Sequence, residues 1–145
     1  MIIKKFSMRY YTEVIEIWRT SGISVGSSDE KEEIKRVFRK NPNLFLIGLI
    51  DRKVIGVVIG AFDGRRGYVH HLAVSPEFQN KGYGKQLMEE LHKRFRNLNV
   101  QKVHLFIEKY NADVINFYKK LGWEIRDDLI MMSYVPNIDL YKRDI

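Results

Sequence analysis

The chain has 145 residues, of which 45% are hydrophobic and 30% charged, and it contains no cysteine. This composition is ordinary for a globular protein. It predicts one domain over residues 1–145 and excludes disulfide bonds and thiolate catalysis. The formal net charge of +7 arises from lysine and arginine interspersed with acidic residues, which is typical of solvated helix faces and argues against nucleic acid as a partner.

No apolar run approaches the ~20 residues that a membrane-spanning helix requires, so we expect no membrane partner. Residues 1–25 include Glu13 and Glu16 rather than an unbroken apolar core, and they show no signal-peptide pattern. Since the chain also lacks cysteine, the sequence predicts a cytoplasmic protein.

The N-terminal part of the chain predicts a strand followed by two helices. Residues 1–6 form a strand-like run, and residues 11–20 place their large apolar side chains on one side of a helix. A loop rich in glycine and serine follows. Asp29 is the expected N-cap of a second helix that runs to about Arg39.

The middle of the chain predicts three consecutive strands. The three apolar, β-rich runs are separated by short turns, the second of which contains Gly64 and Gly67. Runs joined in this way should form antiparallel hairpins. The expected strands cover residues 44–50, 54–62 and 68–74.

The C-terminal half predicts a helix, a strand, a shorter helix and a last extended region. Residues 82–97 carry apolar side chains at the spacing of one buried helical stripe, and residues 102–108 are strand-like. The short helix covers 111–121 and ends at Gly122, and the extended region covers 123–134. Strands interrupted by a crossover helix indicate a mixed sheet in an α/β or α+β fold.

The stretch Gln79-x-x-Gly82-x-Gly84 lies between the third predicted strand and the long helix. Backbone N–H groups at a helix start have no partner inside the helix and lie at the positive end of its dipole. Such groups bind phosphate oxygens, and glycine lets the backbone approach them closely. The stretch therefore predicts an anion-binding helix N-terminus.

Two common phosphate-binding motifs do not match this stretch. A P-loop needs glycine at position 79 and serine or threonine at position 86, and the chain has glutamine at both. The dinucleotide-binding fingerprint needs a third glycine where Leu87 lies, within an early βαβ unit. Both motifs are therefore excluded.

The same stretch is preceded by Leu72-Ala73-Val74-Ser75-Pro76, and together they resemble the acetyl-CoA pyrophosphate loop of the GNAT superfamily of N-acetyltransferases. A second segment, in which Asn111 is followed by Tyr118 and then Leu121-Gly122-Trp123, resembles the C-terminal motif of that superfamily. The hairpin at 60–67 is similar to that of its small bacterial and archaeal YpeA-type branch. The tryptophan at 123 stands where phenylalanine or tyrosine is commoner.

The resemblance implies the GNAT fold, a mostly antiparallel central sheet with two splayed strands and flanking helices, and it implies acetyl-CoA as the cosubstrate. The pantetheine arm would lie between the strand that ends at Val74 and the strand that ends near Glu108. Unpaired backbone groups of the first strand can bind its amides. The implied cofactor-binding residues are Leu72, Ala73, Val74, Gln79, Asn80, Lys81, Gly82, Tyr83, Gly84, Lys85, Asn111 and Tyr118.

The resemblance also implies a general acid. In the family, the tyrosine that matches Tyr118 donates a proton to the departing coenzyme A sulfur. A phenol with an ordinary pKa of about 10 is protonated at neutral pH and suits this role. An ordinary core aromatic residue is the alternative for Tyr118, and a helix cap is the alternative for Asn111.

Two residues are candidates for the general base that deprotonates the attacking amine. His70 should share a strand face with Tyr68, and Glu108 closes the neighbouring predicted strand. In some members of the family, a residue comparable to one of these two is the general base. We favour His70 over Glu108. For each of the two, a role at the surface or in packing is the alternative. His71 should point to the opposite face, because side chains alternate along a strand. The pair is then a poor metal site, and without cysteine we expect no zinc.

These motifs predict an N-acetyltransferase that moves the acetyl group of acetyl-CoA directly to a primary amine in a ternary complex, because no cysteine can form an acetyl-enzyme. The alternative is a non-catalytic acyl-CoA sensor, since the loop at 79–84 would serve both. The acceptor could be a small molecule, a protein or a peptide, and no motif identifies it. The protein could be a monomer or a homodimer.

Overall fold

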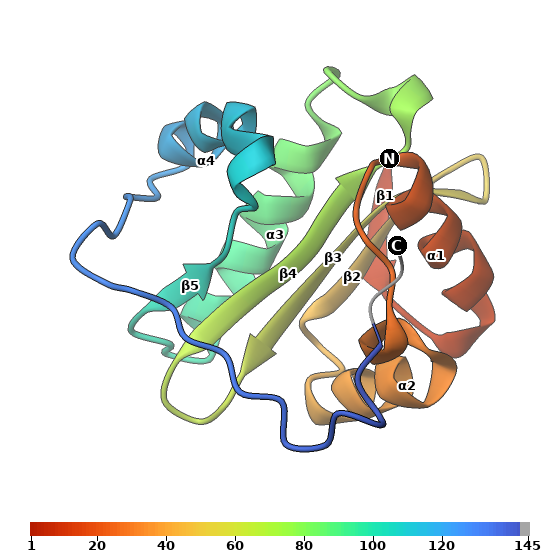
Figure 1. Ribbon diagram of the computed structural model, residues 1–145. Helices are drawn as coiled ribbons and strands as arrows, with labels where there is room; N and C mark the ends of the chain where they lie inside the picture. The colour runs from red at the N-terminus through yellow and green to blue at the C-terminus, as the bar shows by residue number, and fades with distance from the viewer. Residues whose placement is uncertain (143–145) are drawn as a thin grey trace.

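The computed structural model describes residues 1–142 and shows a sheet with helices on both faces (Figure 1). Among these residues the sheet has five strands, and their order in space follows their order in the sequence. The strands are β1 (Ile2–Lys5), β2 (Phe45–Ile50), β3 (Lys53–Phe62), β4 (Gly67–Val74) and β5 (Val103–Leu105). β1 to β4 pair antiparallel, and β5 pairs parallel to β4. The predicted mixed α/β sheet is thereby confirmed.

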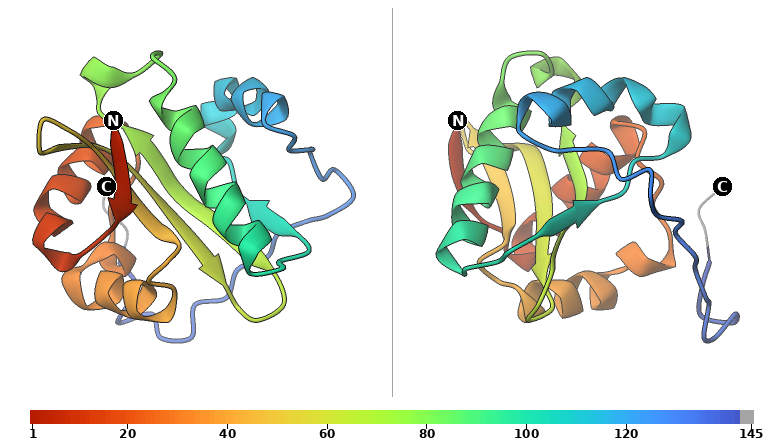
Figure 2. Two further views of the ribbon diagram at one scale, coloured as in Figure 1. Left: turned by 180° about the vertical axis from the view of Figure 1, so that it is seen from behind. Right: turned by 90° about the vertical axis from the view of Figure 1, so that its left-hand side faces the viewer.

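Two helices cover one face of the sheet, and a third covers the other (Figure 2). α1 and α2 pack on the first face, α3 runs along the second, and α4 lies beside the first turns of α3. The helices are α1 (Tyr11–Thr20), α2 (Lys31–Lys40), α3 (Tyr83–Asn97) and α4 (Ile115–Lys120). The short 3₁₀ turns are η1 (Met8–Tyr10), η2 (Ser27–Asp29), η3 (Pro76–Phe78) and η4 (Lys109–Val114).

Both faces of the sheet are buried because β2 and β3 are apolar along nearly their whole length. Trp18 and Ile34 anchor α1 and α2 to one face, and Leu87 and Leu91 anchor α3 to the other. Gly60 permits the close approach of α3, since a Cβ atom there would lie only 2.6 Å from Leu91 Cδ1. The glycine on β3 therefore sets how near α3 lies to the sheet.

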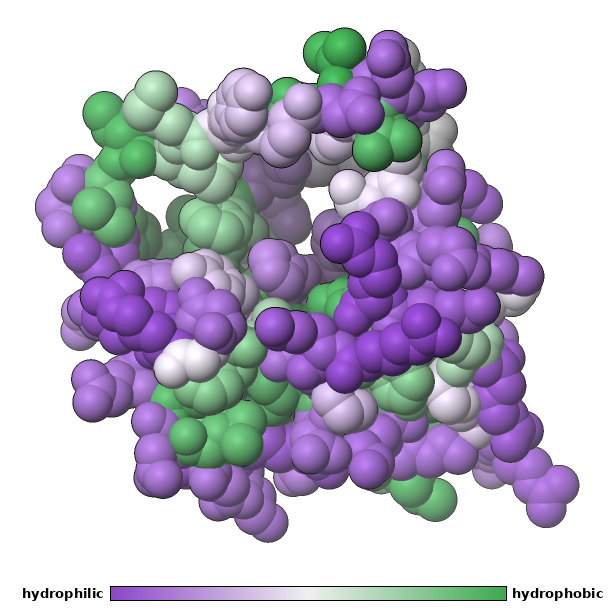
Figure 3. Space-filling view, turned by 90° about the horizontal axis from the view of Figure 1, so that it is seen from below, coloured by the Kyte–Doolittle hydropathy of each residue, from purple (hydrophilic) through white to green (hydrophobic). Residues whose placement is uncertain are grey.

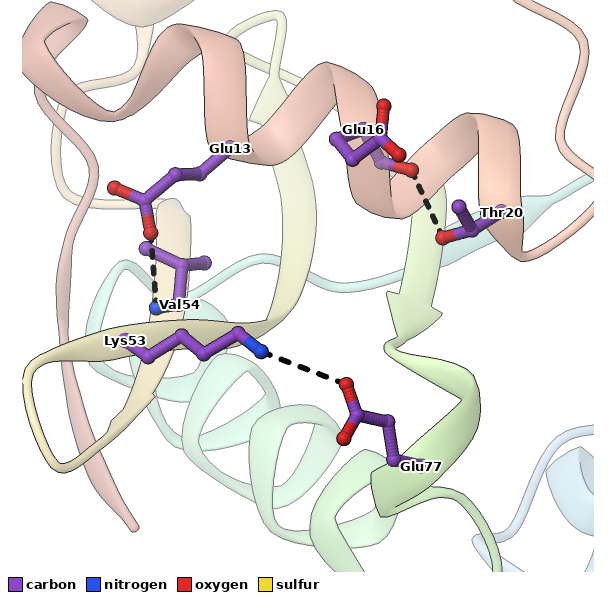
Figure 4. Close-up of polar contacts among 6 residues, drawn as sticks. All are labelled: Glu13, Glu16, Thr20, Lys53, Val54 and Glu77. Atoms are coloured by element: carbon purple, nitrogen blue, oxygen red, sulfur yellow. Dashed lines mark hydrogen bonds and ion pairs between the residues drawn. The ribbon is translucent and has the colours of Figure 1, made fainter.

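Side-chain contacts also join α1 and η3 to the start of β3 (Figure 4). Glu13 Oε2 accepts a hydrogen bond from the Val54 N–H at 3.2 Å, and Lys53 Nζ lies 3.5 Å from Glu77 Oε1. The ion pair is exposed and contributes little to stability. The bond to Glu13 satisfies a backbone donor at the start of β3 and holds α1 to the sheet.

The second helix begins differently from the prediction. α2 starts at Lys31 with Glu30 in the N-cap position, so Asp29 is not its N-cap. Instead, the carboxylate of Asp29 turns back to accept a hydrogen bond from the Gly26 N–H at 3.0 Å, and the residue is only 8% exposed. Asp29 therefore faces the interior rather than the helix start.

The C-terminal part also departs from the prediction. β5 has three residues rather than the expected 102–108, and the extended region at 123–134 forms no strand within residues 1–142. Residues 129–132 are all apolar and lack the alternation that gives an edge strand one buried face. Ile130 and Met132 accordingly remain 92% and 90% exposed.

The segment after α4 crosses in front of the sheet and reaches η2 (Figure 1). There the Ser27 N–H donates to the carbonyl oxygen of Lys142 at 2.8 Å, and the Lys142 N–H donates to Ser27 Oγ at 2.7 Å. The view from below shows openings at the surface and hydrophobic side chains that remain accessible (Figure 3). The segment is thus fixed at its two ends and packs loosely between them.

Candidate active site

β4 and β5 separate partway along β4, and this opens the sheet (Figure 1). The strands part after Val69 and Leu105, while β4 continues to Val74 with a strand partner on its β3 side only. The Ser75 N–H donates to β3, so by alternation the backbone groups of Leu72 and the N–H of Val74 face the open side. The carbonyl oxygen of Val74 already accepts hydrogen bonds from Ser21 Oγ and Gln79 Nε2. An extended ligand with amide groups can bind there as an additional strand would.

The loop between β4 and α3 leaves the start of α3 open. Gln79 Nε2 donates to the carbonyl oxygen of Val74 at 2.9 Å and so fixes the loop to the end of β4. Asn80 and Gly82 have φ angles of +61° and +86°. The first bond of the helix runs from the Gln86 N–H to Gly82 O, so the three N–H groups before Gln86 have no helical partner. They lie at the positive end of the α3 dipole, where an anion can bind.

The space above this helix start fits a phosphate or pyrophosphate group. A Cβ atom on Gly82 would meet no atom within 4 Å, and one on Gly84 would first meet Phe117 Cζ at 3.6 Å. The positive φ of Gly82 also favours glycine. Lys81 and Lys85 are exposed beside this space and add positive charge. The residues present therefore suit a ligand that carries phosphates.

Tyr118 on α4 packs against the core on the α3 side. Its ring centroid lies 5.0 Å from that of Phe117 and 6.0 Å from that of Trp123, and Leu72 belongs to the same cluster. Burial raises the pKa of Tyr118 to about 12, because a phenolate would be poorly solvated there. Within residues 1–142 its hydroxyl has no hydrogen-bond partner. The site therefore holds a protonated phenol that is able to donate.

Glu108 and Asn111 lie outside the sheet, in the segment between β5 and α4. Glu108 does not close β5 as predicted, because the strand ends at Leu105 and Glu108 precedes η4. The Asn111 N–H donates to the carbonyl oxygen of Glu108 at 2.8 Å, whereas the Asn111 side chain caps neither η4 nor α4. The helix-cap alternative for Asn111 is therefore not supported, and its side chain is exposed.

The two histidines of β4 lie on the same side of the sheet, and the predicted opposite orientation of His71 is wrong. The register with β3 shifts here, and His71 has a φ of +51°, so a bulge interrupts the alternation. Val69 packs on the α3 side, so by alternation Tyr68 and His70 lie on the α1 side. Their two rings are stacked, with centroids 6.3 Å apart. The His71 ring is on that side too, 4.9 Å from the ring of Trp18.

His70 is neutral at pH 7 but loosely positioned. Desolvation by the surrounding protein lowers its pKa, and the neighbouring His71 lowers it further. The ring is exposed, and within residues 1–142 it has no hydrogen-bond partner. His70 can therefore accept a proton, but only its contact with Tyr68 orients it.

A polar cluster on the α1 side of β4 has no counterpart among the residues that the sequence predicts for the site. His71 Nε2 lies 3.3 Å from Asp29 Oδ1, and the hydroxyl of Tyr11 donates to the Asp29 carbonyl oxygen at 2.7 Å. Burial acts to raise the pKa of Asp29, but the hydrogen bonds from His71 and from the Gly26 N–H outweigh it and hold that pKa below its usual range. The cluster joins segments far apart in the chain, so no local pattern indicates it.

Among residues 1–142, no group of three or more His, Asp or Glu side chains could hold a metal ion. The hollow lined by Arg65, Arg66 and Asn99 lies at the opposite end of β4. None of the helices in the described part of the chain is long and apolar enough to cross a membrane.

An α/β sheet that opens between two parallel strands, beside a free helix N-terminus, is an arrangement that can hold an extended, phosphate-bearing ligand. Residues 11–123 match the acetyltransferase (GNAT) family. The chain is 29% identical over 131 residues to an acetyltransferase of Yersinia enterocolitica, covering 90% of this chain and 93% of that protein. It is 31% identical over 127 residues to an acetyltransferase of Pectobacterium atrosepticum, covering 88% and 90% respectively.

The fold also matches solved structures. The PaiA N-acetyltransferase of Thermoplasma acidophilum, determined in complex with coenzyme A, superimposes with a TM-score of 0.78 at 23% identity, covering 87% of this chain and 91% of that one. The chain belongs to the GNAT family of acetyltransferases. It is thus an acetyl-CoA-dependent acetyltransferase, with the acetyl donor that is typical of the family.

Proposed function

We propose that the protein transfers the acetyl group of acetyl-CoA to a primary amine, directly and within a ternary complex. The observation that carries this proposal is the partly buried phenol of Tyr118, whose pKa is raised to about 12, next to the opening between β4 and β5. A protonated phenol can give its proton to the sulfur as the carbon–sulfur bond breaks. The absence of cysteine supports direct transfer, since no thiolate can carry the acetyl group.

Acetyl-CoA would bind along the open side of β4. The backbone of residues 72–74 would pair with the pantetheine amides, and Asn111 would contact the arm with its exposed side chain. The pyrophosphate would lie on the unpaired N–H groups at the start of α3, within the loop 79–85. The hydrogen bond from Gln79 to Val74 fixes the loop, which supports this assignment. N–H groups that are already held at the helix start need little rearrangement when an anion binds.

The acceptor amine must lose a proton before it attacks the thioester. His70 and Glu108 are the bases that the sequence suggests, with transfer through water as a further route. His70 lies on the α1 side of the sheet, close to the opening, and its neutral imidazole can accept a proton. Glu108 lies beyond the end of β5, so its role would require a water-mediated path.

Thiol release from acetyl-CoA in the presence of amines tests this proposal. A suitable panel contains a peptide with a free N-terminus, a lysine peptide, spermidine and an aminoglycoside. Because the chain has no cysteine, a thiol reagent in the assay reports coenzyme A alone. Thiol release with at least one amine supports the enzyme. Tight acetyl-CoA binding without release for any amine would favour the sensor alternative.

The same assay tests the general acid. Tyr118→Phe should lower kcat about 100-fold, the usual scale for loss of a general acid, with KM for acetyl-CoA within about twofold. Tyr110→Phe is the matched control, since Tyr110 is in the neighbouring η4 turn and is 73% exposed. Parallel losses of turnover and of acetyl-CoA affinity in Tyr118→Phe would contradict the acid role.

A further inference from the structure

We propose that His71, oriented by Asp29, is the general base that removes the proton from the acceptor amine, in place of His70. This inference rests on the proposed amine acetylation and names a group that acts in it. Its basis is a histidine–carboxylate pair at the point where β4 leaves β5.

Asp29 is a rigid partner for this histidine. It is 8% exposed, its Oδ2 accepts a hydrogen bond from the Gly26 N–H at 3.0 Å, and its carbonyl oxygen accepts one from the Tyr11 hydroxyl at 2.7 Å. A buried carboxylate is costly unless it is paired and hydrogen-bonded. These contacts keep Asp29 ionised and fix its position relative to β4.

The pairing with Asp29 determines which nitrogen of His71 is available. Nε2 lies 3.3 Å from Asp29 Oδ1, and a carboxylate this close favours the proton on that nitrogen in the neutral ring. Nδ1 is then the proton acceptor. The side chain is 34% exposed, which leaves the ring accessible from solvent and to a substrate. A carboxylate that orients an imidazole in this way also stabilises the imidazolium that forms.

Contacts from α1 hold the backbone and the ring of His71. Trp18 Nε1–H donates to the His71 carbonyl oxygen at 3.0 Å, and the two rings meet edge to face with centroids 4.9 Å apart. The φ angle of +51° is costly for a residue other than glycine, and such strain is maintained where the surroundings over-determine it, often at functional sites. The bulge lies two residues beyond Val69, the last β4 residue paired with β5.

His71 has one carboxylate and one histidine as neighbours within residues 1–142. Asp29 faces it from η2, and His70 is its neighbour on β4. From α1, the side chain that faces it is the uncharged Trp18. By comparison, His70 has no carboxylate or other hydrogen-bond partner within residues 1–142. The orientation needed for efficient proton transfer is therefore built around His71.

The reaction balances with these two groups. The ammonium form of the acceptor gives one proton to His71 Nδ1, and the freed lone pair forms the bond to the carbonyl carbon. The carbon–sulfur bond breaks, the sulfur keeps its electron pair, and it takes the proton of Tyr118. The second amine proton returns to the Tyr118 oxygen as the amide forms, and His71 releases its proton to water.

The pH dependence of kcat/KM tests the assignment, with acetyl-CoA and whichever amine of the panel the wild type acetylates. His71→Gln should lower kcat/KM at least 100-fold and abolish the fall in rate at acidic pH. His70→Gln should retain that fall. Asp29→Asn should lower kcat/KM, because an amide no longer holds the imidazole in the tautomer that leaves Nδ1 free. The proposal would be overturned if kcat/KM no longer fell at acidic pH in His70→Gln but still fell in His71→Gln.

A second measurement keeps this test separate from that of acetyl transfer itself. Nitrogen-15 NMR of the histidine side chains should show neutral His71 protonated at Nε2, and Asp29→Asn should weaken that preference. Acetyl-CoA affinity and thermal stability of His71→Gln, measured in parallel, identify any folding defect. If no amine is acetylated, the proposed function fails, whereas an Nδ1-protonated His71 overturns the pairing with Asp29 whatever the activity.

Discussion

At the scale of single residues, Tyr118 is a partly buried phenol packed against Phe117 and Trp123. Burial raises its pKa from the ordinary 10.0 to about 12, so between these values the unfolded chain loses the phenolic proton while the folded chain keeps it. Stability therefore falls as pH rises through this window, by up to about 2–3 kcal/mol from two pKa units. This is the same property that keeps the phenol a proton donor at neutral pH.

Urea unfolding at pH 8, 10 and 11 measures this effect. We expect the free energy of unfolding of the wild type to fall more steeply above pH 10 than that of Tyr118→Phe, which has no ionisable group at this position. Tyr11, whose pKa burial also raises, contributes equally to both proteins and cancels in the comparison. Parallel pH dependences would show that the phenol is better solvated than its packing indicates.

At the scale of elements, α4 is attached to α3 through one hydrogen bond and aromatic packing. Trp123, just after α4, donates from Nε1 to His92 Nε2 of α3 at 3.0 Å. Phenylalanine, one of the residues commoner at this position in the family, could not make this bond. Trp123→Phe should therefore lower the free energy of unfolding by about 1 kcal/mol, the usual net value of such a bond. Urea titration measures the loss, and an unchanged midpoint would show that packing alone attaches α4.

The same contact makes the attachment of α4 sensitive to acid. His92 must be neutral to accept the bond, and burial, assisted by the charge of Arg96, lowers its pKa from 6.5. Below pH 6.5 the unfolded chain binds a proton before the folded chain does, so stability declines until the folded pKa is reached. His92→Gln keeps an acceptor and should lose less stability between pH 7.5 and 5 than the wild type. Equal losses would assign the acid dependence to other groups.

The elements that follow from local patterns could be predicted, and those set by long-range contacts could not. The helix at 11–20 and the consecutive hairpins follow from hydrophobic periodicity and turn residues, and both are confirmed. Asp29 was wrongly predicted to cap α2 because its partner, His71, lies far along the chain. The face of His71 was wrong because alternation does not anticipate an inserted bulge residue.

For the candidate site, the sequence indicated several residues but not the contacts that hold them. The glycine loop and Tyr118 carry recognisable motifs, and the structure places both beside the opening between β4 and β5. The role of the Gln79 side chain in bracing the loop against Val74 depends on a loop conformation that spacing alone does not specify. The short length of β5 could not be predicted either, because the strand ends where β4 and β5 diverge.

At the scale of the whole molecule, the site connects the open side of β4, the start of α3 and the segment before α4, so one ligand should protect all three. Hydrogen exchange with and without coenzyme A tests this. We expect slower exchange at residues 72–74, 79–85 and 108–118, where N–H groups gain partners or ordering, and little change in α2. At 100 times its Kd, the ligand should also stabilise the fold by about 2.7 kcal/mol.

Gly84→Asp provides the matched variant for this experiment. A side chain fits at position 84, since a Cβ atom there would meet Phe117 at an ordinary 3.6 Å, and a carboxylate near a helix N-terminus stabilises the helix. The same negative charge would occupy the anion site and repel a pyrophosphate. The variant should therefore fold at least as stably as the wild type, bind coenzyme A at least 100-fold more weakly, and lose the protection at all three segments together. Retained protection in this variant would show that the ligand binds elsewhere on the molecule.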